Sequence, residues 1–149
     1  MNTNALDTIQ ILLVEDDPAD QKLVRAAFKN ARIANGLRIT GSGEEAMDFL
    51  NRRPPHDPGA PRPDLILLDL NMPGMGGMEF LRLIKEDRRL AMIPVVVMTS
   101  SDAEEDIVRS YELHVNAYVT KPVGLEELQK VVAKIEDFWF LLCRLPPKG

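Results

Sequence analysis

The chain has 149 residues, of which 45% are hydrophobic and 28% charged, and its formal net charge is −5. This composition is typical of one soluble globular domain, and the acidic balance argues against binding to nucleic acid or to an anionic membrane surface. No apolar run approaches the roughly 18 residues of a membrane span, and the first residues, MNTNALDT, lack the features of a secretory signal.

Short apolar runs alternate with helical patterns along the chain. The run at residues 9–14 has no polar face, which predicts a strand covered on both sides. Asp17 before Pro18 then gives an N-cap and a first helical residue. Further strands are predicted at residues 37–40 (more polar, expected at an edge), 65–68, 94–98 and 117–119. Helices are predicted from Pro18 through Phe28, from Ser42 to Leu50, at 77–87 and 102–113, and from Leu125 to about Phe138.

This order repeats a strand and a helix five times, which predicts an α/β fold with a doubly wound, five-stranded parallel sheet covered by helices on both faces. The one irregular stretch, RRPPHDPGAPRP at residues 52–63, contains five prolines. We interpret it as a stiff, exposed loop before the third strand. A proline-rich segment that binds a partner is the alternative.

Polar residues stand where the predicted strands end, and ligands of open parallel sheets bind beyond those carboxyl ends. The residues are Glu15, Asp16 and Asp17 after the first strand, Asp69 after the third, Thr99-Ser100 after the fourth and Lys121 after the fifth. Clustered carboxylates repel each other unless a cation offsets them, and such oxygen ligands suit Mg²⁺. Thr99 could donate a hydrogen bond to a phosphoryl oxygen, and Lys121 could pair with the carboxylate or with the phosphate. The set therefore has the parts needed to phosphorylate an aspartate.

Cysteine and histidine are too few for a metal site of their own. The chain has one cysteine, Cys143, and two distant histidines, His56 and His114. A single cysteine cannot form an internal disulfide, which fits a reducing cytoplasm.

Four segments together resemble the receiver domain of two-component response regulators, over about residues 9–135. They are Val14-Glu15-Asp16-Asp17, the run from Leu67 to Gly77 (LLDLNMPGMGG), Met98-Thr99-Ser100-Ser101 and Ala117-Tyr118-Val119-Thr120-Lys121-Pro122. The resemblance implies the flavodoxin and CheY-like arrangement, with strand order 2-1-3-4-5. It also implies that Asp69 is the phosphoacceptor.

The same resemblance implies roles for the neighbouring residues. Glu15 and Asp16 would be the acidic pair, with Asp16 the more direct Mg²⁺ ligand, and the backbone carbonyl of Asn71 would be a further ligand. Thr99 resembles the switch hydroxyl, Lys121 the family's lysine, and Tyr118 the aromatic that moves inward on activation. Lys121-Pro122 would be a cis peptide.

The implied function is that of a signalling protein rather than an enzyme. A histidine kinase would transfer its phosphoryl group to Asp69, and the transfer would shift a pre-existing conformational equilibrium. About ten residues follow the last predicted helix, so we expect output through protein contacts or a phosphate relay rather than through a second domain.

Some of these residues have simpler interpretations. Asp17 competes for the metal role, but its place before Pro18 favours a helix cap. His114 stands where such domains commonly have a glycine, and we do not expect it to be a ligand or a phosphohistidine. Met72, Met75 and Met78 cluster in the sequence, and filling of gaps in the core explains them best.

Three other classes of function are alternatives to a receiver. A haloacid-dehalogenase-type phosphatase would need a second aspartate where Asn71 stands. A nucleotide-binding module would need a glycine-rich loop where the acidic run after the first strand stands. A receiver-fold adaptor that works without phosphorylation stays open.

The run Phe138-Trp139-Phe140-Leu141-Leu142 is more apolar than one helix face can bury. We therefore divide the chain into a receiver domain at residues 1–137 and an apolar extension at 138–149. Folding back onto the chain's own core is one interpretation, and we favour a homodimer through the last helix and this tail. The tail also resembles that of regulators paired with bacterial and cyanobacterial phytochromes, which implies a phytochrome-type kinase as partner.

Overall fold

The computed structural model describes residues 9–29, 31, 36–52, 62–99, 105, 108–109, 115–120 and 124–144, and the side chains of all of these except 120 and 138–144. The strands are β1 (Ile11–Val14), β2 (Leu37–Thr40), β3 (Leu65–Asp69), β4 (Val95–Thr99) and β5 (Ala117–Thr120). The helices are α1 (Pro18–Lys29), α2 (Gly43–Leu50), α3 (Gly77–Glu86) and α5 (Leu125–Arg144).

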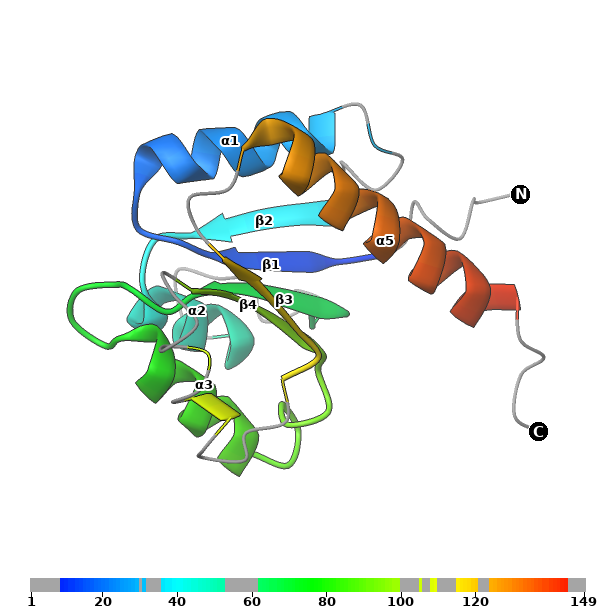
Figure 1. The fold of residues 1–149 in the computed structure, drawn as a ribbon. Helices are drawn as coiled ribbons and strands as arrows, with labels where there is room; N and C mark the ends of the chain where they lie inside the picture. Colours follow the sequence, from blue (N-terminus) through cyan, green and yellow to red (C-terminus); the bar gives the residue numbers. More distant parts are fainter. Residues whose placement is uncertain are drawn as a thin grey trace.

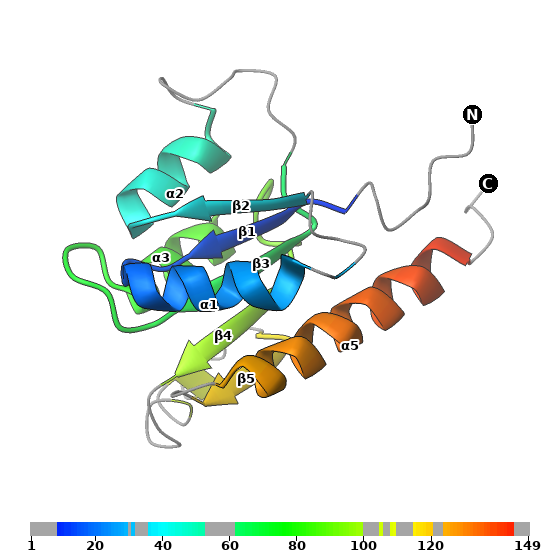
Figure 2. The same cartoon turned by 90° about the horizontal axis from the view of Figure 1, so that it is seen from above.

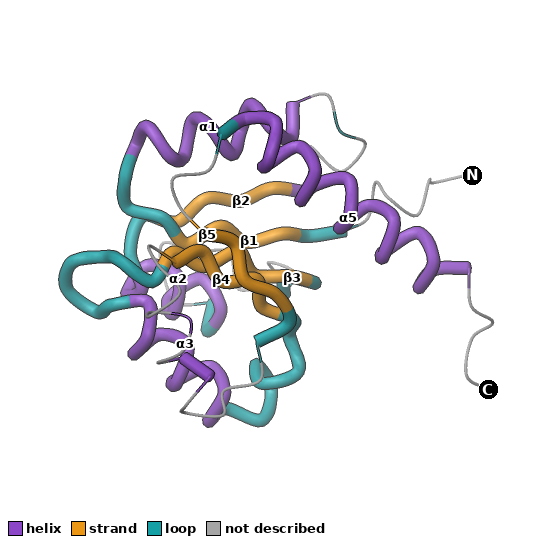
Figure 3. Tube along the Cα trace, in the orientation of Figure 1, coloured by secondary structure: helices purple, strands orange, loops and turns teal. Residues whose placement is uncertain are grey.

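The strands form one parallel sheet in the order β2-β1-β3-β4-β5 (Figures 1 and 3). This order confirms the doubly wound fold, and β2 stands at the edge as its polar sequence predicted. The register aligns the carboxyl ends, since Val14 lies opposite both Thr40 and Leu68, and Asp69 lies opposite Met98. The polar residues that follow these strands are therefore brought to one edge of the sheet.

Two cores lie on opposite faces of the sheet because alternate strand residues point to opposite sides. Helices α2 and α3 cover one face, and α1 and α5 cover the other (Figures 1 and 2). Leu12 of β1 packs into the first core, whereas its neighbour Leu13 packs into the second. Both side chains are fully buried, as expected for a strand without a polar face.

Two boundaries differ from the prediction in ways that concern the site. Asp69 and Thr99 are the last residues of β3 and β4 rather than the first residues after them. Their backbones are therefore held by the sheet, and Leu70 continues this bonding when its N–H donates to the Met98 carbonyl at 3.2 Å.

The last helix is also longer than predicted. α5 continues past Phe138 to Arg144, because nothing in the apolar run interrupts a helix and the first proline comes at 146. Within the described ranges, no helix combines the length and the apolar character needed to cross a membrane.

Two predicted features fall largely outside the described residues. Of the helix expected at 102–113, the structure describes Glu105, Val108 and Arg109, which are helical. Val108 is buried in the core under α2 and α3. Residues 53–61, most of the proline-rich stretch, are not described.

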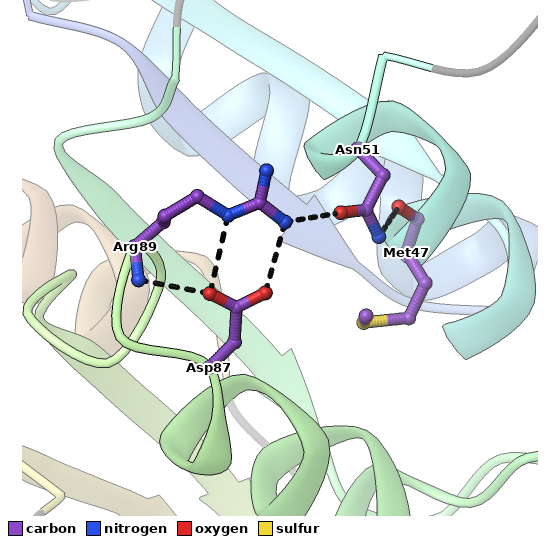
Figure 4. A network of polar contacts seen from close by, with 4 residues as sticks. All are labelled: Met47, Asn51, Asp87 and Arg89. Atoms are coloured by element: carbon purple, nitrogen blue, oxygen red, sulfur yellow. Dashed lines mark hydrogen bonds and ion pairs between the residues drawn. The ribbon is translucent and has the colours of Figure 1, made fainter.

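A polar network joins the ends of α2 and α3 (Figure 4). The Arg89 guanidinium donates to both carboxylate oxygens of Asp87 and, at 3.0 Å, to Oδ1 of Asn51. Asn51 is the C-cap of α2, and its side-chain amide donates to the Met47 carbonyl at 3.0 Å. The pKa of the Asp87 carboxyl is lowered by these Arg89 hydrogen bonds. The network ties the two helices together at the edge of the sheet opposite the strand carboxyl ends.

Candidate functional site at the strand carboxyl ends

Three carboxylates meet where β1 and β3 end. Glu15, Asp16 and Asp69 each place a carboxylate oxygen within 4.8 Å of the others. Glu15 is fully buried, Asp69 is 2% exposed and Asp16 is half-buried. This is the pair after the first strand and the aspartate of the third that the sequence predicted. Carboxylates packed so closely suit a hard cation with oxygen ligands.

The backbone around Glu15 is held from both sides. Its N–H donates to the Thr40 carbonyl of β2 at 3.0 Å, and its carbonyl accepts from Nε2 of Gln21 on α1 at 2.6 Å. Its carboxylate accepts from the Asp17 N–H at 3.2 Å. These bonds fix the direction in which the Glu15 side chain leaves the end of β1.

Asp69 is positioned by the loop that follows it. The N–H of Asn71 donates to Oδ1 of Asp69 at 3.1 Å. One carboxylate oxygen thus has a backbone donor, and the Asn71 peptide is held next to the acidic cluster.

Asp17 is the N-terminal cap of α1, as its place before Pro18 predicted. Its Oδ1 accepts from the Ala19 N–H at 2.8 Å, and its carbonyl accepts from the Gln21 N–H at 2.9 Å. Asp17 is exposed and stands outside the group of carboxylates that could hold a metal. Of the three acids in the run, the structure therefore places two in the cluster and one at the helix.

Thr99 ends β4, the strand next to β3, and is fully buried. Its hydroxyl oxygen has no hydrogen-bond partner among the described residues. A buried hydroxyl without a partner is unusual in a folded protein, because its desolvation costs free energy that no bond offsets. Thr99 thus places a hydroxyl that can donate a hydrogen bond at the carboxyl edge of the sheet.

Tyr118 lies on β5 and is half-buried. The Arg109 guanidinium stacks over its ring, 4.5 Å from the centroid, and the same Arg109 donates to Glu105 Oε1 at 2.6 and 3.2 Å. Burial raises the pKa of the Tyr118 hydroxyl, Arg109 opposes this rise, and Glu105 adds to it. The aromatic predicted to switch is thus in contact with a charged pair.

Several predicted residues lie outside the described ones. They are Ser100, Lys121, Pro122 and His114, together with the side chains of Phe138, Trp139, Phe140, Leu141 and Leu142. Of the three methionines, Met72 is buried in the core, and Met75 and Met78 pack partly buried against it. That position agrees with gap filling.

The sequence did not predict the roles of two further residues at the site. Gln21 supports the backbone of Glu15, and its place one turn into α1 is the only signal for that. Glu44 of α2 accepts a hydrogen bond from the Met75 N–H, in the loop after Asp69, at 2.8 Å. No sequence pattern indicates this contact, because the two residues are 31 positions apart.

Comparison with known proteins agrees with this geometry. Residues 11–133 match the response regulator receiver domain family. Response regulator Rcp1 of Synechocystis sp. is 48% identical over 136 residues, which cover 91% of this chain and 92% of Rcp1. The solved structure of the phosphorylated cyanobacterial phytochrome response regulator RcpA has a TM-score of 0.77 at 44% identity, covering 93% of this chain and 99% of RcpA. The Mn²⁺-bound form of Rcp1 has a TM-score of 0.76 at 47% identity, covering 93% and 99%.

Proposed function

We infer the function of this chain from its family, because the chain belongs to the response regulator receiver domain family. In this proposal Asp69 accepts a phosphoryl group from a phosphohistidine of a sensor kinase, in a reaction that depends on Mg²⁺. The observation that carries the proposal is the acidic cluster. It joins two buried carboxylates and a half-buried one at the ends of adjacent strands, and β4 adds the buried Thr99 hydroxyl at the same edge.

The transfer is a substitution at phosphorus. An oxygen of Asp69 attacks the phosphorus atom while the bond to the histidine nitrogen breaks, and the released imidazole nitrogen takes a proton from water. The hydrogen bond from the Asn71 N–H keeps the Asp69 carboxylate oriented. Thr99, whose hydroxyl has no partner in the described part of the chain, would then donate a hydrogen bond to a phosphoryl oxygen. We place Lys121 beside the same phosphate, as the family resemblance implies.

The residues present fit a small divalent cation. Glu15, Asp16 and Asp69 would hold it, together with the backbone carbonyl of Asn71, and oxygen ligands favour Mg²⁺ over softer metals. When bound, the cation offsets the negative charge of the carboxylates and of the incoming phosphoryl oxygens. The existence of a Mn²⁺-bound form of Rcp1 supports the binding of a divalent ion.

Output in this proposal passes through surfaces that respond to the phosphate. Movement of Thr99 toward the phosphoryl group makes room for Tyr118, which shifts a pre-existing equilibrium rather than creating a new state. The phytochrome response regulators among its structural relatives support a phytochrome-type kinase as partner. We also propose a homodimer through the end of α5, for which the apolar run from Phe138 to Leu142 is the main support.

Labelling by a small phosphodonor tests the function directly. The wild-type protein with Mg²⁺ and acetyl phosphate is expected to gain one phosphoryl group in its intact mass, and Asp69→Asn none. Asp17→Asn is the matched control, because it removes one carboxylate beside the site but keeps the oxygen that caps α1. It is expected to label normally.

Two results would contradict the proposal. Normal labelling of the Asp69→Asn variant would place the phosphoacceptor elsewhere. No response of the wild-type protein to acetyl phosphate or to beryllofluoride with Mg²⁺ would instead favour a receiver-fold adaptor that acts without phosphorylation.

A further inference from the structure

The loop that joins β3 to α3, residues 70–76, carries the Asn71 carbonyl proposed to bind the metal. It is drawn in green to the left of α3 in Figure 1. The base of this loop is closed by backbone bonds. The Leu70 N–H donates to the Met98 carbonyl at 3.2 Å, and the Gly77 N–H donates to the Leu70 carbonyl at 3.3 Å. These bonds fix where the loop leaves and rejoins the body of the protein.

Helix α2 also holds the loop, through Met75. Glu44, in the first turn of α2, accepts the Met75 N–H on Oε1 at 2.8 Å. Gly74, directly before Met75, has a φ of +72°, a left-handed conformation that glycine adopts without strain. Met75 also packs tightly on Gly43. A Cβ added at Gly43 would lie 3.0 Å from both the carbonyl oxygen and the sulfur of Met75. The loop is therefore held between α2 and the sheet.

Glu45, the next residue, offers an internal comparison. Its Oε2 accepts the Gly41 N–H, also at 2.8 Å, and both carboxylates belong to exposed residues. Gly41 belongs to the turn between β2 and α2, so this bond closes the helix start rather than the loop after Asp69. Two adjacent glutamates thus make similar bonds to different segments.

We propose that Glu44 is a positioning residue for the metal centre. It holds the Met75 peptide, and with it the loop that presents the Asn71 carbonyl. This inference rests on the proposed function, since it assumes a cation between Glu15, Asp16 and Asp69. Helix α2, which contributes no carboxylate to the cluster, would in this way raise the metal affinity. The physical reason is that a ligand held in place before binding loses less conformational freedom when the metal arrives.

Three variants separate the hydrogen bond from the charge. Glu44→Ala removes both, Glu44→Gln keeps an oxygen that can accept the Met75 N–H, and Glu45→Ala is the matched loss of a neighbouring carboxylate. One readout is exchange of the Met75 amide proton with deuterium in the metal-free protein, followed by NMR. The other is Mn²⁺ affinity, from the electron paramagnetic resonance signal of the free ion.

With Glu44→Ala we expect the Met75 amide to exchange about tenfold faster, as loss of one hydrogen bond predicts. Mn²⁺ affinity should fall about threefold to tenfold, less than the roughly 10–100-fold typical when a direct partner of a metal ligand is lost. Glu44→Gln and Glu45→Ala should both stay within about twofold of the wild type in Met75 exchange and in Mn²⁺ affinity.

Equal Mn²⁺ affinity in Glu44→Ala and Glu45→Ala would overturn the inference while leaving the proposed function intact. Equal losses in Glu44→Gln and Glu44→Ala would also overturn it, because charge alone would then explain the effect. A wild-type protein that binds no Mn²⁺ would instead remove the proposed function on which the inference rests.

Discussion

The Thr99 hydroxyl is buried without a described partner, and removing it should therefore stabilise the protein that has no phosphate bound. We predict that Thr99→Val raises the free energy of unfolding by about 1 kcal/mol, because valine has nearly the same shape and no polar group to desolvate. Urea denaturation of the unphosphorylated protein measures this. A loss of stability would show that the hydroxyl has a partner in the resting protein, and would weaken its assignment as a donor reserved for phosphate.

Because Arg109 stacks on Tyr118, replacing Arg109 is expected to shift the pKa of the Tyr118 hydroxyl. Burial raises the pKa of Tyr118 above its ordinary value of 10.0 and Arg109 counters this, so Arg109→Leu should raise the pKa further. The ultraviolet absorbance of tyrosinate measures it, with Tyr118→Phe identifying the signal against the other tyrosine, Tyr111. The ionised form is disfavoured in the folded protein. The contribution of the neutral Tyr118 hydroxyl to the stability of the fold is therefore complete below pH 10.0. It is lost as the pH rises through the pKa of Tyr118 in the folded protein. A lower Tyr118 pKa in Arg109→Leu would contradict the stacking.

At the scale of elements, α3 begins against the end of β3. A Cβ added at Gly77 would meet the Asp69 carbonyl oxygen and lie 2.5 Å from the Leu70 Cα. Helix propensity alone predicts that Gly77→Ala gains about 1 kcal/mol, whereas overpacking predicts a loss of about 1–3 kcal/mol. Both groups in the way are backbone, so we expect the loss, measured by urea denaturation. At Gly76 an added Cβ would meet only the Met72 carbonyl, at 3.9 Å, so Gly76→Ala is the control. Equal stability of the two variants would contradict this packing.

Sequence patterns predicted the elements well where burial repeats with a fixed period. The alternation of Leu12 and Leu13 between two cores follows from a parallel sheet covered on both faces. The same reasoning predicted that Asp16 and Asp69 lie close together, because the carboxyl ends of parallel strands share an edge of the sheet. Asp17 was separable from them because a residue before proline has a local role of its own.

What sequence patterns could not predict depends on the conformation of loops or on contacts between distant residues. The bond between Glu44 and Met75 requires a left-handed Gly74, and glycine alone does not indicate which φ it takes. The stacking of Arg109 on Tyr118 depends on how the segment before β5 meets the strand. The end of α5 was misplaced because an apolar run fits a helix and a separate extension equally well.

At the scale of the whole molecule, α5 extends beyond the body of the protein. Its first three turns pack on α1 and the sheet through Leu128, Val132 and Ile135, whereas its last turns run past the strands in both views (Figures 1 and 2). Its 20 residues correspond to a length of about 30 Å. The helix therefore carries the run from Phe138 to Leu142 away from its own sheet. The position of the 138–144 backbone supports the proposal that a second copy of the chain is the partner.

Two truncations test this arrangement. Removal of residues 138–149 should convert a dimer to a monomer in sedimentation, because it deletes the part of α5 that lies beyond the sheet. Removal of residues 145–149 alone is the control, and should leave the dimer intact because α5 ends at Arg144. Both shortened chains keep Ile135, the last core residue among the α5 side chains that the structure describes, so the receiver should stay folded in each. A full-length chain that sediments as a monomer, or a dimer that survives the longer deletion, would place the output surface elsewhere on the receiver.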